Sequence, residues 1–177
     1  FPLITLTGTG WTLTATDQDD NPPYYPSSRF GSFTSAPIKV DAGSAEQLVA
    51  VLPGETLMPG TVQGKSGDVL LSTAGVQIDV NVYVTDHFNN VVKVPPASNG
   101  SSAGDVRISI KDNTDPYFLT TASTRAIEAT TGLAVFQITP IKAGTHTVMA
   151  EDFTSAHGTP WKSSPSSSFP LSNILNV

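Results

Sequence analysis

Four oxygen-bearing side chains lie close together near the start of the chain. Asp17, Asp19, Asp20 and Asn21 form the stretch DQDDN, directly after the alternating stretch GTGWTLTATD. Calcium takes six to eight oxygen ligands, and carboxylates and amides at the end of a strand can supply them. The cluster makes calcium the one cofactor that the sequence suggests. The similar loop DFTSAHG at 152–158 lacks these residues, so such a site would not recur along the chain.

A second, weaker cluster of the same kind lies in DNTDP. It consists of Asp112, Asn113 and Asp115. Calcium is one interpretation, but Asp and Asn side chains also bond to backbone groups in turns, and that role explains the cluster without a metal.

Three aromatic residues in long polar loops could contact a ligand. Tyr24 and Tyr25 follow one proline, and Trp161 follows another. Flat rings in loops can stack on a sugar, which predicts a carbohydrate-binding or adhesive module as the alternative function. The same rings can instead pack the loop onto its own domain or contact another subunit. Because an aromatic residue follows proline in both loops, a repeated structural role is favoured.

Residues for catalysis or phosphate binding do not form convincing patterns. The stretch PGTVQGKSG at 59–67 has Pro59 where a phosphate-binding loop needs its first glycine. His87, His146 and His157 have no second histidine at ligand spacing, and no Gly-x-Ser-x-Gly motif occurs. Two distant carboxylates could still meet across a fold, as in glycosidases, and a sequence does not reveal this. We expect that the chain is not an enzyme.

Composition and periodicity indicate many short strands. Apolar residues make up 38% of the chain, Gly and Pro number 14 each, and cysteine is absent. Apolar residues alternate with polar ones in most segments, and only 122–130 could form a helical turn. The predicted fold is an all-β, immunoglobulin-like antiparallel β-sandwich. The predicted strands cover 46–53, 75–86, 91–94, 105–111, 132–138, 144–152 and 172–177.

The chain contains an internal repeat. Residues 1–17 match residues 136–152 in apolar phase, turn position and final aspartate, with Phe1 over Phe136 and Asp17 over Asp152. With two extra residues in the second loop, 38–40 fall over 175–177. A fixed period of this kind indicates a tandem array. We therefore expect residues 1–40 to be the last strands of a preceding module and 41–177 to be a complete module.

The junction and the strands after it resemble a known family. VDAGSAEQLVAVLPGE followed by TAGVQIDVNVYVTDHFNNVV, with GLAVFQITPIKAGTHTVMAED later, is similar to bacterial immunoglobulin-like tandem repeats of the invasin and filamin-like kind. The resemblance covers most of 37–152 and implies tandem extracellular modules in stalks, adhesins, filaments or surface layers. The long insert at 53–74 and the loops at 18–32 and 153–168 depart from the family's compact form.

These observations predict a structural extracellular module from a longer protein. The expected partners are adjoining immunoglobulin-like repeats or identical subunits in a fibre, with a glycan as the alternative. The net charge of −6 and the scattered basic residues argue against nucleic-acid binding. No apolar run approaches the ~18 residues of a membrane-spanning helix. The expected location is therefore extracellular or at the cell surface.

Overall fold

The computed structural model describes residues 7–17, 31–93, 105–110, 115, 117, 119–120, 122–153 and 161–172. For 105–110 and 164–165 it describes the backbone alone. The chain divides into two compact units, Thr7–Asp41 and a larger unit that includes Ala42–Val177. The boundary between them lies in the small-residue stretch VDAGSAEQL.

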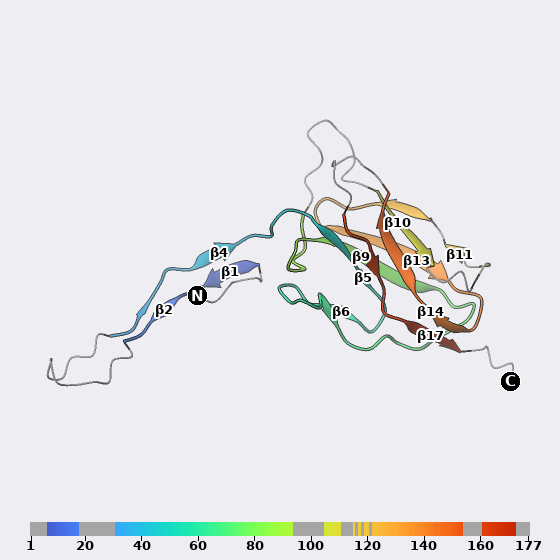
Figure 1. Ribbon diagram of the computed structural model, residues 1–177, viewed down its shortest axis with the longest axis horizontal. Coiled ribbons are helices and arrows are strands. Elements are labelled where there is room, and N and C mark those ends of the chain that lie inside the picture. Colours follow the sequence, from blue (N-terminus) through green and yellow to red (C-terminus); the bar gives the residue numbers. More distant parts are fainter. Residues whose placement is uncertain are drawn as a thin grey trace, which may run out of the picture. The chain divides into compact units, whose positions relative to one another are not determined.

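The larger unit consists of short strands joined by turns (Figure 1). The all-β prediction is confirmed, and residues 122–130, the one stretch that could form a helical turn, contain instead a strand that pairs with β10. The strands are β5 (Gln47–Val51), β6 (Thr56–Leu57), β7 (Lys65–Ser66), β8 (Ser72–Thr73), β9 (Ile78–Thr85), β10 (Asp105–Ile110), β11 (Leu119–Thr120), β12 (Thr124–Ala126), β13 (Leu133–Thr139), β14 (Gly144–His146), β15 (Val148–Asp152), β16 (Ser164–Pro165) and β17 (Phe169–Ser172).

Two four-stranded antiparallel sheets form an immunoglobulin-like sandwich. One has the order β11-β13-β9-β5 and the other β12-β10-β15-β16. A single core cluster joins the first sheet to β15 and β17, with Val82, Phe136 and Val148 all fully buried. Face-to-face packing of this kind removes each sheet's apolar face from water, which is the main stabilising term in such a fold.

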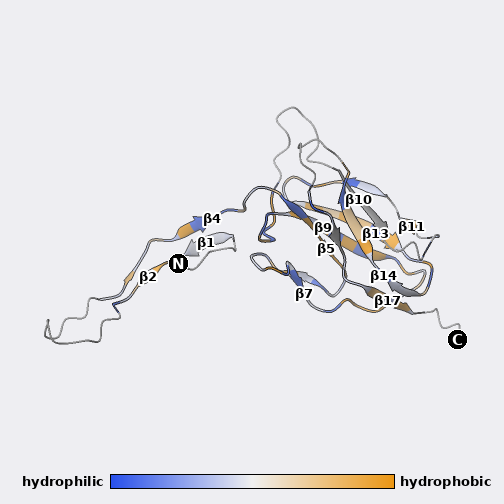
Figure 2. Ribbon diagram, viewed as in Figure 1, coloured by the Kyte–Doolittle hydropathy of each residue, from blue (hydrophilic) through white to orange (hydrophobic). Residues whose placement is uncertain are grey.

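The sequence of β9 alternates so that one face of the strand lies in the core. Its even-numbered residues Val80, Val82 and Val84 are fully buried, whereas Asn81 and Tyr83 between them are half-buried and Asp79 before them is exposed. β-Branched residues at every second position suit a pleated strand with one face in the core. The expected alternation at 75–86 is therefore present, but the strand begins only at Ile78, and Val76 is 50% exposed. Figure 2 shows the alternation of apolar and polar residues along the strands.

The chain enters and leaves the larger unit at opposite ends of β9. Gln47, at the start of β5, pairs with Thr85 at the last position of β9. Ser172, at the end of β17, accepts a hydrogen bond from the backbone of Ala74, which precedes the start of β9.

Several strand predictions are corrected by the structure. The closing strand is β17 at Phe169–Ser172, and residues 173–177 of the predicted strand at 172–177 lie outside the described residues. Residue Val91 forms only an isolated bridge to Thr85. The insert at 53–74, expected as a loop, contains the β6–β7 hairpin and β8, which runs parallel to β17.

The smaller unit is a long β-hairpin. It consists of β1 (Gly8–Trp11), β2 (Thr14–Ala15), β3 (Phe33–Thr34) and β4 (Ile38–Val40). β1 pairs with β4 and β2 pairs with β3, both antiparallel, so the hairpin carries two successive ladders. That these residues end a preceding module stays a prediction.

Candidate functional site

The turn after β9 gathers several segments at the end of the larger unit where the chain enters. Asp86 is 4% exposed and accepts five hydrogen bonds, one from the Gly43 N–H at 2.9 Å and the others from Phe88 and Asn90. Gly43 lies in the stretch that begins this unit. The Asp86 carboxylate therefore fixes the first residues of the unit to the end of its longest strand.

Hydrogen bonding keeps the Asp86 carboxylate charged. Burial disfavours the charged form, but bonds from the Asn90 side chain and from the Gly43, Asn90 and Phe88 backbone outweigh it and lower the pKa of Asp86. A carboxylate that accepts several N–H groups in this way acts as a structural anion. Its oxygens are already occupied by donors from the protein.

Asn89 extends this network to the insert. Its Nδ2 donates to the Thr61 carbonyl at 2.7 Å, and its Oδ1 accepts from Gln47 Nε2 at 2.8 Å. Asn89 has a positive φ of 62°, a conformation that Asn tolerates better than most residues. Gly64 lies against it, and a Cβ there would come within 2.7 Å of the Asn89 side chain. The turn thus connects the entry segment, β5 and the insert.

The lysine of the phosphate-loop-like stretch is part of a buried ion pair. Lys65 Nζ lies 3.1 Å from Glu55 Oε1 and donates to the Ala50 carbonyl at 2.9 Å. The Glu55 side chain is 3% exposed and also accepts from the Leu52 N–H and from Ser167 Oγ. Lys65 ties the insert to the main sandwich and is not free for a phosphate.

The structure describes only Asp115 of the second candidate calcium cluster. Asp115 is 4% exposed and accepts from the backbone N–H groups of Tyr117, Ile141 and Lys142. Burial raises its pKa, but these bonds, with a smaller electrostatic contribution from His146, lower the pKa of Asp115 overall. The described part of the cluster is a turn cap. Asp112 and Asn113 lie outside the described residues.

Of the first calcium candidate, only Asp17 is described, and Asp19, Asp20 and Asn21 lie outside the described residues. The counterpart of Asp17 in the repeat is Asp152, whose Oδ2 accepts a hydrogen bond from the Trp161 backbone N–H at 2.9 Å. Among the described residues, no group of three or more His, Asp or Glu side chains could hold a metal ion. Calcium binding stays a prediction.

The three loop aromatics do not share one environment in the structure. Trp161 is 7% exposed and belongs to the core cluster, and the next residue, Lys162, pairs with β5 at Gln47. Its ring therefore packs against its own unit and offers little surface to a sugar. Tyr24 and Tyr25 lie outside the described residues. A glycan contact through these two stays a prediction.

The hairpin of the smaller unit repeats a hydrogen-bond pattern of the larger unit. Ser35 Oγ accepts from the Leu13 N–H at 3.0 Å and donates to the Ala36 carbonyl, while the Ser35 N–H donates to the Leu13 carbonyl. Ser166 Oγ accepts from the Val148 N–H at 3.1 Å and donates to the Ser167 carbonyl, while the Ser166 N–H donates to the Val148 carbonyl. In both cases a serine joins two strands at the break between two ladders.

The ladders on either side of this serine also correspond. β2–β3 corresponds to β15–β16, and β1–β4 corresponds to β14–β17. Trp11 is paired with Ile38 as His146 is paired with Phe169. The described strands of residues 8–40 and of residues 144–171 therefore make the same bonds in the same order, as the expected repeat predicts, and we call them the first and second copies of the hairpin.

The structure corrects the second half of the sequence alignment. Leu13 and Ser35 are 22 positions apart, whereas Val148 and Ser166 are 18 positions apart. The first copy therefore has the longer loop, and not the second as expected. Residues 38–40 correspond to 169–171 rather than to 175–177.

We expect the two serines to differ in their effect on stability. Ser166 is 7% exposed, so Ser166→Ala leaves the buried Val148 N–H without its acceptor and lowers the free energy of unfolding by about 1–3 kcal/mol. Ser35→Ala is the matched control, since its bond is exposed to water, and it costs at most about 0.5 kcal/mol. Urea denaturation followed by circular dichroism measures both. Equal losses would contradict the idea that burial makes the Ser166 hydrogen bond the more stabilising of the two.

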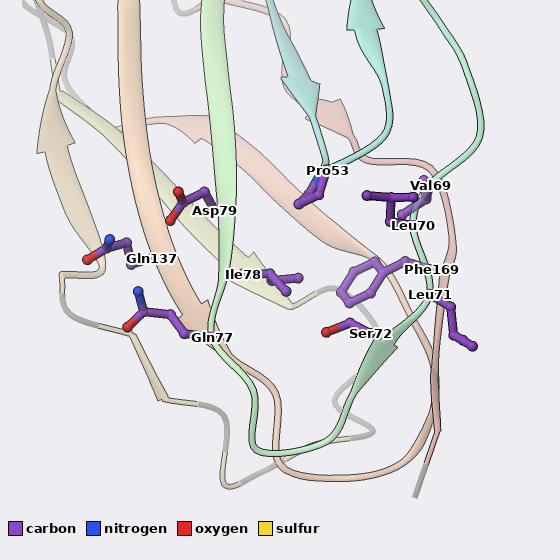
Figure 3. Close-up of a pocket in the computed structure, with 10 residues that line it drawn as sticks. All are labelled: Pro53, Val69, Leu70, Leu71, Ser72, Gln77, Ile78, Asp79, Gln137 and Phe169. Atoms are coloured by element: carbon purple, nitrogen blue, oxygen red, sulfur yellow. The ribbon is translucent and has the colours of Figure 1, made fainter. Parts of the chain in front are cut away.

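A surface pocket of about 430 Å³ lies beside the first half of β9. In Figure 3, Gln77, Asp79 and Gln137 lie on one side of the β9 ribbon, and Ile78 and Phe169 lie on the other. Leu70 and Leu71 at its edge are 64% and 69% exposed. Among the described residues that line it, Asp79 alone is ionisable, so these residues include no acid–base pair. The described residues that line it are Pro53, Val69, Leu70, Leu71, Ser72, Gln77, Ile78, Asp79, Gln137 and Phe169.

Comparison with known proteins finds only distant structural likeness. No family model and no curated protein matches the chain. The chain is similar to the D00-D0 domain of intimin, with 12% identity, a TM-score of 0.40, and coverage of 80% of this chain and 56% of that one. It is also similar to domains 1–6 of the surface layer protein SbsC, with 13% identity, a TM-score of 0.36, and coverage of 80% and 15%. None of the described residues forms a helix that could span a membrane. The immunoglobulin-like sandwich is assigned from the chain's own sheets.

Proposed function

We propose that this chain is a structural extracellular repeat module of a cell-surface stalk, fibre or filament that acts through module-to-module contacts. The observation that carries the proposal is the recurrence of one hairpin, with the same serine and the same order of ladders, at 8–40 and 144–171. In a protein built from successive copies of one module, the last strands of each module recur at a fixed spacing along the sequence.

The path of the chain through the larger unit supports this role. The chain enters beside the last residue of β9 and leaves near its first. The line from the entry point to the exit point runs along β9. The hydrogen bonds between β5 and β9 are perpendicular to this line, because antiparallel ladder bonds run perpendicular to the strands. A pull along the axis of such an array would load these bonds together in shear.

The buried polar groups also serve structure. Asp86 and Asp115 cap turns at opposite ends of the sandwich, and Glu55 is paired with Lys65. Each of these carboxylates is occupied by donors from the protein. In the proposed module they hold the ends and the insert in place.

Immunogold labelling of intact source cells tests the proposed location and assembly. Antibodies raised against the chain are expected to label the outer surface in rows or patches, and external protease is expected to remove the label. An antibody against a cytoplasmic protein is the control for cell integrity. Label confined to the interior of sectioned cells would overturn the proposal.

A further inference from the structure

The apolar side chains of the hairpin 8–40 gather on one face. Cross-strand partners lie on the same side of a ladder, so Ala15 shares a face with Phe33 and Trp11 shares one with Ile38. Phe33 is 72% exposed and Leu13 is 47% exposed. We call this surface the hairpin face, and it consists of Trp11, Leu13, Ala15, Phe33, Ile38 and Val40.

The opposite face of the same hairpin is polar. Thr12, Thr14 and Thr16 are exposed and alternate with the hairpin-face residues. Thr14 and Thr34, which are cross-strand partners, share a hydrogen bond between their hydroxyl groups at 3.1 Å. Lys39, which is exposed, separates Ile38 from Val40. The hairpin thus has one water-facing side and one side suited to a core.

In the second copy of the hairpin, five of the six equivalent positions are covered, and the sixth, Ser164, pairs with Ala150 as Phe33 pairs with Ala15 but has its side chain outside the described part of the structure. Five residues of this copy correspond to members of the hairpin face and are at most 5% exposed: His146, Val148, Ala150, Phe169 and Leu171. They belong to, or pack beside, the core that contains β5, β9 and β13. The covering surface includes Leu48, Ala50, Val80 and Val82, which are 0–2% exposed.

The side chains of the two copies also suit similar cores. The pair His146 and Phe169 has its ring centroids 5.8 Å apart. At the same place, the first copy has Trp11 and Ile38, so the larger ring lies on the other strand and the pair again joins two large apolar or aromatic side chains.

From this correspondence we infer that the hairpin face docks on a block of strands built like residues 46–139, contributed by the module that precedes the hairpin in the full-length polypeptide. The inference rests on the proposed function, because it requires successive modules in one chain. A second copy of this chain is the less suitable occupant, since its own block is already covered by its own hairpin. A two-stranded hairpin is marginal in water alone, so docking would also stabilise it.

The experiment uses the absence of cysteine in the chain. Single variants Leu13→Cys and Phe33→Cys probe the hairpin face, and Thr14→Cys on the polar face is the matched control. Each is made in the 177-residue chain and in an extended chain, in which residues 42–139 are fused ahead of residue 5. The rate of reaction with a soluble maleimide is then measured.

In the extended chain, we expect Leu13→Cys and Phe33→Cys to react at least about 100-fold more slowly than in the original chain, because a docked face reacts only when it opens. Thr14→Cys is expected to react at nearly the same rate in both. Hydrogen exchange of the two chains without substitutions gives a second measurement, with new protection expected at 8–15 and 33–40.

Unchanged reaction rates and unchanged exchange would overturn the inference. Protection that rises with the concentration of the original chain would also overturn it and would identify a second copy as the occupant. Either result would leave surface labelling of cells unaffected. Failure of this inference can therefore be told apart from failure of the proposed function.

Discussion

Lys65→Met is expected to lower the free energy of unfolding of the larger unit by about 3–5 kcal/mol, because it leaves the buried Glu55 carboxylate without its positive partner. The side chains of Lys65 and Glu55 are 17% and 3% exposed, so water can replace little of the lost interaction. The Ala50 carbonyl also loses a hydrogen bond. Urea unfolding at pH 7 measures the loss.

A double variant separates the ion pair from simple packing. Glu55→Gln keeps an oxygen for the Leu52 N–H and removes the charge, so adding it to Lys65→Met should restore about 1–3 kcal/mol relative to the sum of the single losses. Strictly additive losses would contradict a coupled pair.

The exposed pair of Lys162 and Glu46 provides the control for the buried pair. Their side chains are 63% and 38% exposed. Lys162→Met is therefore expected to cost less than about 1 kcal/mol. A loss as large as that of Lys65→Met would show that removal of any lysine, rather than burial of the pair, explains the effect.

The main strands could be predicted because their pattern depends on nearby residues. A strand with one face in the core needs an apolar residue at every second position, and Val80, Val82 and Val84 meet that need without reference to the rest of the chain. The same local alternation carries the predicted match between residues 1–17 and 136–152.

The second strand of the hairpin could not be aligned correctly from the sequence, because the alternation of apolar residues does not reveal how long the loop before that strand is. Ser35 and Ser166 become equivalent only when the bonds to Leu13 and Val148 are seen. A serine three residues before the alternating apolar pair Ile38 and Val40, or Phe169 and Leu171, is the signal that could have found them.

The structural carboxylates were missed for a related reason. The composition of the stretch DHFNN is typical of a turn and points to no distant partner, but Asp86 reaches Gly43 across 43 positions of sequence. Glu55 and Lys65 lie in an insert rich in Gly and Pro, where charged residues are normally solvated. Trp161 resembles an exposed loop aromatic by its polar neighbours, and only tertiary packing places it in the core.

Asp86→Ala is expected to lower the free energy of unfolding by about 3 kcal/mol at pH 7. The substitution leaves buried donors of Gly43, Phe88 and Asn90 without their acceptor, and each such group carries a desolvation cost. Hydrogen exchange should rise at Gly43 in particular, because its N–H is held by Asp86. Asp79→Asn, an exposed position on β9, is the control and should change the stability little.

The lowered pKa of Asp86 also predicts how the effect of a second substitution, Asp86→Asn, depends on pH. A carboxyl group whose pKa is lower in the folded state contributes stability above its unfolded pKa of about 3.9 and loses it as the pH falls through the folded pKa. Asp86→Asn removes this titration, so the difference in unfolding free energy from the unsubstituted chain should be large at pH 7 and should shrink toward pH 2. Urea unfolding across that range measures the difference. A gap that stays constant with pH would show that Asp86 acts through its shape alone, and a gap that narrows would show that its charge holds the entry segment in place.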